Sequence, residues 1–208
     1  IVRLVGSEMC IRDRNQIASF YPGAMSEARN IELKPIVDQV GGADVVLIGA
    51  NDPEGMRRHT DECRFRGYPF AADPSQQLAR MDGDDIKPLI EGAEYLFTNE
   101  YEAALIEQKT GWTAADLAAI VNVRIITLGP DGARIERRGC DPVLVGVPEE
   151  ESKADPTGVG DAFRAGFLAG QSWGLSDERS AQVGSLVATY VIETIGTCLL
   201  YTSDAADD

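Results

Sequence analysis

A glycine-rich segment bounded by two aspartates, residues 155–166, holds the residue types in this chain best suited to chemistry. It reads Asp-Pro-Thr-Gly-Val-Gly-Asp-Ala-Phe-Arg-Ala-Gly. A glycine loop that opens directly into a helix presents unpaired backbone N–H groups and the positive end of the helix dipole, and these bind anions such as phosphate. Asp161 would place a carboxylate at the mouth of that anion site. Phosphoryl transfer requires this arrangement.

Composition narrows the classes of partner. The chain has 208 residues, of which 44% are hydrophobic, and its 19 basic and 34 acidic side chains give a net charge of −15. Binding to a nucleic-acid backbone needs clustered basic residues, so we expect no nucleic-acid partner. We see no apolar run of about 18 residues and no signal peptide, so we expect no membrane partner. The cysteines lack the regular spacing of a metal site or disulfide framework, and we expect a cytoplasmic location.

The two ends of the chain differ in character from the rest. Residues 1–14 and 198–208 resemble translated sequencing-adapter DNA, and we expect each to be a non-native or disordered extension. The expected folded domain then spans residues 15–197.

Within that domain, strands and helices alternate four times. The expected strands are 44–49, 69–73, 95–98 and 124–128. The main expected helices are 53–66, 99–109, 113–120, 161–171 and 177–194. We also expect an antiparallel pair of strands at 133–136 and 143–147. The apolar run 44–49 is typical of a parallel strand covered on both faces. This alternation predicts a doubly wound α/β sheet whose ligands bind beyond the carboxyl ends of the strands.

The glycine loop fits neither of the two common nucleotide-binding motifs. No apolar strand leads directly into Gly158 and Gly160, which argues against a Rossmann fingerprint. The spacing and the lysine of a Walker P-loop are also absent.

Three segments together resemble the ribokinase (PfkB) family of sugar and nucleoside kinases. Residues 155–163 resemble its C-terminal signature, residues 99–102 match its N-x-x-E motif, and residues 127–132 resemble its nucleotide-phosphate loop. Within the family, residues 20–25, 73–80 and 155–170 are similar to the adenosine kinases of actinobacteria.

The resemblance implies a fold and a reaction. The implied fold is a ribokinase-like three-layer α/β/α, mainly parallel sheet, with residues 15–197 as a partial kinase domain that lacks the N-terminal strands and lid. The implied reaction is ATP-dependent phosphorylation of the 5′-hydroxyl of a nucleoside, adenosine to AMP. Two alternatives stay open: a sugar kinase such as ribokinase, and a truncated nucleotide-binding remnant without activity. A full-length parent would be expected to form a homodimer.

The resemblance also assigns roles in the glycine loop. Asp161 is implied to be the catalytic base, and a carboxylate is already ionised at neutral pH. The N–H groups of Gly158, Val159 and Gly160 are implied to form the anion hole. The competing interpretation is that Asp161 is a first-turn carboxylate favoured only by the helix dipole. Asp155 is implied to hold a monovalent cation such as K⁺, although Pro156 departs from the usual threonine.

The remaining implied roles concern the metal and the two substrates. Asn99 and Glu102 would hold Mg²⁺ through water; the alternative is a polar helix start. The implied ATP-binding residues are Thr127, Gly129 and Gly132, for which the alternative is a simple β-turn. The implied nucleoside-binding residues are Phe20, Gln76, Gln77 and Arg80, each of which could equally be structural.

Overall fold

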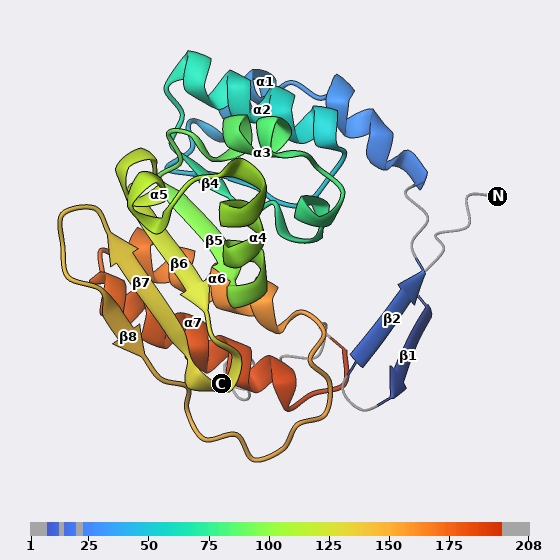
Figure 1. Ribbon diagram of the computed structural model, residues 1–208, viewed down its shortest axis with the longest axis vertical. Coiled ribbons are helices and arrows are strands. Elements are labelled where there is room, and N and C mark those ends of the chain that lie inside the picture. The colour runs from blue at the N-terminus through green and yellow to red at the C-terminus, as the bar shows by residue number, and fades with distance from the viewer. Residues whose placement is uncertain (1–7, 13–14, 20–22, 197–208) are drawn as a thin grey trace, which may run out of the picture.

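The computed structural model describes residues 8–12, 15–19 and 23–196. Its main feature is a mixed six-stranded sheet in the order β3-β4-β5-β6-β7-β8, parallel from β3 to β6 and antiparallel from β6 to β8 (Figure 1). The strands are β3 (Val46–Ile48), β4 (Phe70–Ala72), β5 (Tyr95–Asn99), β6 (Val123–Thr127), β7 (Ala133–Arg137) and β8 (Val143–Val145).

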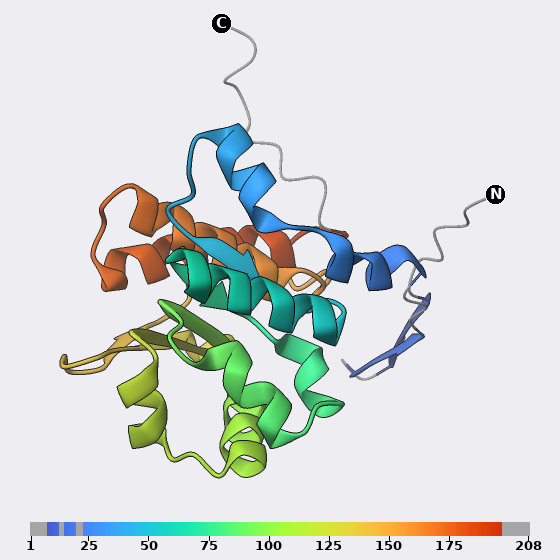
Figure 2. The same ribbon diagram turned by 90° about the horizontal axis from the view of Figure 1, so that it is seen from above.

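Helices cover both faces of this sheet. One set comprises α2 (Pro53–Arg66), α3 (Gly83–Ile90), α4 (Glu100–Thr110) and α5 (Ala114–Ile120), and the other comprises α6 (Val159–Ser172) and α7 (Asp177–Ile192). Because side chains alternate along a strand, Phe70 and Ala72 of β4 join the core under the first set, whereas Ala71 joins the core under α6 and α7. Figure 2 shows the sheet between the two groups of helices. The predicted three-layer α/β/α architecture is confirmed.

Local sequence signals explain where the helices begin and end. α2 starts at Asp52, whose side chain accepts the Gly55 N–H at 2.9 Å, and it ends at Gly67 in the left-handed conformation. α5 begins with a capping box between Thr113 and Asp116, as their spacing predicts. Both helices keep the bounds expected from the sequence to within a residue.

Close contact between α6 and α7 fixes the position of α6. A Cβ atom added at Gly166 would lie 2.8 Å from Gly184 Cα, and one added at Gly170 would lie 2.7 Å from Ser180 Cα. Only small residues permit such a short approach of two helix backbones. The middle and the C-terminal part of α6 therefore pack closely against α7.

The expectation that β3 is covered on both faces is wrong. Leu47 is 45% exposed, whereas Ala71, its register partner on β4, is fully buried. The physical reason is that β3 is the edge strand of the described sheet, beyond the part that α6 and α7 cover. Ile48, which faces the other set of helices, is buried as expected.

The first described residues form a separate two-stranded sheet beside the main body (Figure 1). β1 (Glu8–Arg12) pairs antiparallel with β2 (Asn15–Ser19), and η1 (Gly23–Asn30) and α1 (Leu33–Val40) follow before β3. β1 lies within the expected extension 1–14, whose non-native origin stays a prediction, and residues 198–208 lie outside the described part. Among the described residues, no helix is both long and apolar enough to cross a membrane.

Candidate active site

The carboxyl ends of β4, β5 and β6 bring separate parts of the sequence to one edge of the sheet. Asp73 follows β4 directly, Asn99 ends β5 and Thr127 ends β6. Asn99 and Thr127 are register partners, and the Asp73 N–H donates to Ile48 O at 2.9 Å. The structure thus brings the N-x-x-E motif and the segment 127–132 together at the edge where ligands of such sheets bind.

The start of α6 presents backbone N–H groups, as an anion site requires. Gly158 is the N-cap and adopts the left-handed conformation, with φ of 80°. The helical hydrogen bonds begin with the Ala162 N–H, which donates to Gly158 O at 2.8 Å, and the Val159 N–H makes only a long bond of 3.4 Å to Pro156 O. The N–H of Gly160 precedes the first helical bond, so it belongs to the turn whose N–H groups can face an anion.

Asp155 anchors this loop to the end of α7. Its carboxylate accepts the Thr157 N–H at 2.9 Å and the Gly196 N–H at 3.2 Å, and its own N–H donates to Ile192 O at 3.2 Å. Hydrogen bonds from Thr157 and then from Gly196 hold the pKa of Asp155 below its ordinary value. Because the Asp155 carboxylate accepts these two backbone N–H groups, it stabilises the conformation of the loop. Its role as a K⁺ ligand stays a prediction.

A chain of three charged side chains joins the loop to β4. The Asp161 side chain is 85% exposed, and its Oδ1 accepts a hydrogen bond from Arg164 Nη1 at 3.0 Å. Arg164 also makes a bidentate contact with Asp73, with Nε 2.7 Å from Oδ2 and Nη2 2.8 Å from Oδ1. The candidate base is therefore linked through one guanidinium to a buried carboxylate.

Two opposing effects act on the pKa of Asp73. Burial and, to a smaller extent, the neighbouring carboxylates of Glu102 and Asp161 raise this pKa, whereas Arg164 lowers it; the net result is a pKa of about 6. The bidentate contact alone would favour the charged form, but burial outweighs it because Asp73 is only 5% exposed. Perturbed carboxylates of this kind concentrate at functional sites.

Sequence reasoning missed Asp73 and Arg164 as members of the site. Asp73 follows a strand, at the edge where ligands bind in this fold class. Arg164 lies three residues after Asp161 on a helix, a spacing that brings two side chains together. Both signals are present in the sequence, but the contact between them spans 91 residues and is visible only in the structure.

Asn99 and Glu102 form a capping box at the start of α4. The Glu102 carboxylate accepts the Asn99 N–H at 2.8 Å, and Asn99 Oδ1 accepts the Glu102 N–H at 2.8 Å. The polar-helix-start interpretation is thus correct for these side chains. Among the described residues, no group of three acidic, histidine or cysteine side chains could hold a metal. The donors still fit Mg²⁺, because this ion takes few carboxylates and completes its shell with water and phosphate oxygens.

The segment 127–132 forms a tight turn after β6. It contains η3 (Gly129–Asp131), and the Leu128 N–H donates to Gly132 O at 2.7 Å. Gly132 has φ of 92°, and a Cβ atom there would lie 1.9 Å from Val145 O, so no other residue fits. The turn alternative therefore describes the backbone, and contact with ATP by Thr127, Gly129 and Gly132 stays a prediction.

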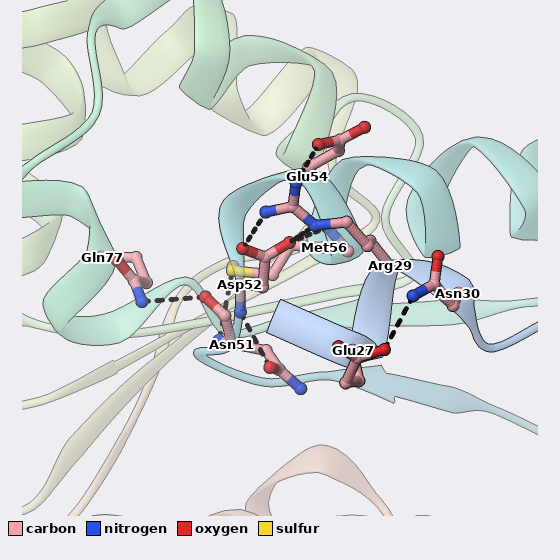
Figure 3. Close-up of polar contacts among 9 residues, drawn as sticks. Glu27, Arg29, Asn30, Asn51, Asp52, Glu54, Met56 and Gln77 are labelled. Carbon is pink, nitrogen blue, oxygen red and sulfur yellow. Dashed lines mark hydrogen bonds and ion pairs between the residues drawn. The ribbon is translucent and has the colours of Figure 1, made fainter. Parts of the chain in front are cut away.

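The turn after Asp73 orients its two glutamines differently. Gln77 of η2 (Ser75–Ala79) is buried, and its Nε2 donates to Asn51 O at 2.8 Å, as Figure 3 shows. Gln76 and Arg80 are exposed, and Ser75 has the left-handed φ of 46°, which is strained for a residue other than glycine. Gln77 holds the turn in place, whereas Gln76 and Arg80 can reach a ligand. Phe20 lies outside the described residues.

A second ion cluster supports the loop that Gln77 contacts. Arg29 bridges Asp52 and Glu54, with Nη2 2.6 Å from Asp52 Oδ1 and Nη1 2.7 Å from Glu54 Oε2 (Figure 3). The hydrogen bond from Arg29 keeps the pKa of Asp52 below its ordinary value. Asp52 also caps α2, so this cluster fixes the loop between β3 and α2 beside η1.

Comparisons with known proteins agree with one another. A family model described as pfkB family carbohydrate kinase matches residues 5–203. A nucleoside kinase of Methanocaldococcus jannaschii is 28% identical over 188 residues, which cover 89% of this chain and 59% of that protein.

Solved structures resemble this chain over a similar range. The nucleoside kinase of Burkholderia thailandensis in complex with inosine is 35% identical, with a TM-score of 0.82, and the match covers 88% of this chain and 60% of that one. The adenosine kinase of Sinorhizobium meliloti is 25% identical, with a TM-score of 0.65, and covers 81% and 54%. The fold is thus ribokinase-like, and the chain spans about three-fifths of the length of its first relatives.

Proposed function

Because the chain belongs to the PfkB family of carbohydrate kinases, we propose that it transfers the γ-phosphoryl group of ATP to the 5′-hydroxyl of a nucleoside. Adenosine, converted to AMP, is the proposed acceptor. The observation that carries this proposal is the placement of the exposed Asp161 carboxylate beside the N–H groups that begin α6. Support for a nucleoside comes from relatives that are named nucleoside kinases, one of them in a complex with inosine.

In the proposed reaction, Asp161 accepts the proton of the attacking hydroxyl. The freed oxygen forms a bond to the γ-phosphorus, the bond from that phosphorus to the bridging oxygen breaks, and ADP leaves with the electron pair. The N–H groups of Gly158, Val159 and Gly160 stabilise the negative charge on the transferring group. Asn99 and Glu102 would hold Mg²⁺ through water, and this ion would supply positive charge beside the phosphates.

The two substrates would approach from different elements. Thr127, Gly129 and Gly132 are the proposed contacts for ATP at the end of β6. Gln76 and Arg80, exposed on the turn after Asp73, are the proposed contacts for the nucleoside, with Gln77 supporting that turn from within. Stacking by Phe20, K⁺ binding by Asp155, a cytoplasmic location and a homodimer belong to the same proposal.

Two alternatives compete with this function. A sugar such as ribose could replace the nucleoside, because the family model covers carbohydrate kinases in general. The chain could instead bind ATP without catalysis.

A direct assay separates the three functions. The purified chain is incubated with Mg²⁺, ATP and, in turn, adenosine, inosine, cytidine or ribose, and the phosphorylated product is separated by chromatography. We expect AMP from adenosine, and a rate about 10²–10⁴ lower for Asp161→Asn. Phosphorylation of ribose alone would establish the sugar kinase. ATP binding in a calorimeter without product or nucleoside binding would establish the remnant and refute the proposed function for this chain.

A further inference from the structure

Arg164 is the one side chain that contacts both the candidate base and the buried end of β4 among the residues described. Its side chain is only 15% exposed, although it borders the exposed Asp161. Arg164 contacts Asp73 on its buried side and Asp161 on its exposed side. Its hydrogen bonds indicate which of these two carboxylates orients it.

The Arg164 guanidinium is oriented by Asp73 rather than by Asp161. Two of its nitrogens, Nε and Nη2, form the planar bidentate contact with Asp73, whose side chain is 7% exposed. The remaining nitrogen, Nη1, donates to Asp161 at 3.0 Å. Because the fork is rigid and planar, the contact with Asp73 determines where Nη1 points.

The glycine loop also lies against this guanidinium. A Cβ atom added at Gly160 would come 2.9 Å from Arg164 Nη1, closer than such atoms normally approach. Nη1 therefore lies close to both the Asp161 carboxylate and Gly160 of the proposed anion hole. A shift of Arg164 would disturb both at once.

We propose that Arg164 is a positioning residue that, held by Asp73, fixes the Asp161 carboxylate in the orientation in which it accepts the hydroxyl proton. This inference rests on the proposed function, because it assigns Asp161 the role of base. Asp73 also directly precedes the turn that carries Gln76 and Arg80. The same contact therefore ties the base to the acceptor side of the site.

A second Arg–Asp pair in the molecule provides a matched control. Arg137 of β7 and Asp177 of α7 form the same bidentate contact, with Nε 2.6 Å from Oδ2 and Nη2 2.7 Å from Oδ1. Among the described residues, neither forms a hydrogen bond or ion pair with the loop 155–161 or with a proposed ligand residue. Substitutions in this pair therefore report the cost of losing such a contact without the positioning role.

The test compares Arg164→Met and Asp73→Asn with Arg137→Met and Asp177→Asn in the kinase assay. A displacement of a catalytic group by about 1 Å costs about 10²-fold in rate, so we expect Arg164→Met to lower kcat by about that factor with KM for ATP little changed. Asp73→Asn, which keeps the shape but loses one acceptor for the fork, should lower kcat in the same direction. The two control variants should keep wild-type kcat.

Each outcome decides the inference. Unchanged kcat in Arg164→Met refutes it, and so does a fall in kcat that Asp73→Asn does not share, because Arg164 would then act on the substrate directly. Should Arg164→Met fail to fold by circular dichroism, Asp73→Asn alone decides in the same way.

A readout that needs no turnover separates this inference from the proposed function. The ¹³C carboxyl resonance of Asp161 should shift in Arg164→Met and Asp73→Asn and stay in place in the two control variants. If the wild-type chain makes no product, the proposed function fails while this resonance still decides whether Arg164 and Asp73 position Asp161. A resonance that stays in place in all four variants overturns the positioning role.

Discussion

Two Arg–Asp pairs in this molecule share one geometry and differ in their electrostatics. In both, Nε and Nη2 of the arginine contact the two carboxylate oxygens, at 2.7 and 2.8 Å for Arg164–Asp73 and at 2.6 and 2.7 Å for Arg137–Asp177. The pKa of Asp177 is lowered, chiefly by the hydrogen bond from Arg137. The pKa of Asp73 is raised to about 6, chiefly by burial.

The neighbours of each pair explain the difference. Beside Asp177 the next partner is the neutral Gln171, whose Nε2 donates to Oδ1 at 3.1 Å. Asp73 is more buried, and two further carboxylates, Glu102 and Asp161, act on it. The contact distances alone therefore do not reveal the charge state of a pair. Perturbed carboxylates grouped around one cation are typical of functional sites.

Replacing the arginine of each pair should produce the largest difference between the pairs in the free energy of unfolding. Arg164→Met leaves Asp73 buried with two other carboxylates, and the loss of one partner from a buried pair costs about 3–5 kcal/mol. Arg137→Met should cost about 1 kcal/mol, because that pair is more exposed. Urea denaturation at about pH 8 measures both free energies of unfolding. Equal losses would show that the two pairs differ in no energetic respect.

The pH dependence of stability should have opposite signs for the two aspartates. Asp73 has a folded pKa of about 6 against an ordinary value of 3.8, so its contribution to stability is fully present below 3.8 and is lost as pH rises through 6. This change is at most about 3 kcal/mol, since one pKa unit corresponds to about 1.4 kcal/mol. Asp177 has a lowered pKa, so its contribution is present above 3.8 and is lost as pH falls below that value.

Asparagine variants measure these two dependences. Relative to wild type, Asp73→Asn should gain stability as pH rises from about 4 to about 7, because the variant carries no charge to bury. Asp177→Asn should lose stability relative to wild type as pH rises from about 2 to about 5. Denaturant titrations across this range provide the data. A common sign for the two variants would contradict the electrostatic difference.

Local signals in the sequence predict most of the fold. The N-cap at Asp52 and the capping box at Thr113 determine helix ends through residues adjacent in the chain. The prediction that the strand containing Leu47 is covered on both faces was wrong, because such cover depends on where the strand lies in the sheet. The capping box of Asn99 shows how one local motif satisfies both a structural and a proposed metal-binding interpretation.

The site was predictable only in part for the same reason. The neighbouring glycines identify Asp161 as a candidate site residue in the sequence. Asp73, the partner of Arg164, lies 91 residues away from it and follows a different element. Likewise, two adjacent glutamines look equivalent in the sequence, and only packing turns Gln77 inward and leaves Gln76 exposed. Contacts between distant elements are set by how the layers pack, and no local pattern encodes them.

The smallest change in stability is expected from adding a carboxylate beside the Arg137–Asp177 pair. This change also tests whether neighbouring carboxylates explain the difference between the two pairs. Gln171 donates to Asp177 and to Ser180 Oγ, and it accepts a hydrogen bond from Tyr95 at 3.2 Å. Gln171→Leu removes these bonds without adding charge and should cost about 1 kcal/mol at any pH. Gln171→Glu instead places a second carboxylate beside Asp177, as Glu102 and Asp161 stand beside Asp73.

Gln171→Glu should therefore make the pH dependence of the Arg137–Asp177 pair more similar to that of the Arg164–Asp73 pair. The added negative charge raises the pKa of Asp177, so the variant should lose about 1 kcal/mol more than Gln171→Leu at about pH 8 and should recover this difference as the pH falls toward 4. A ¹³C titration of the Asp177 carboxyl and denaturation at both pH values measure the change. If the two variants show the same pH dependence, neighbouring carboxylates do not distinguish the pairs, and burial alone must account for the raised pKa of Asp73.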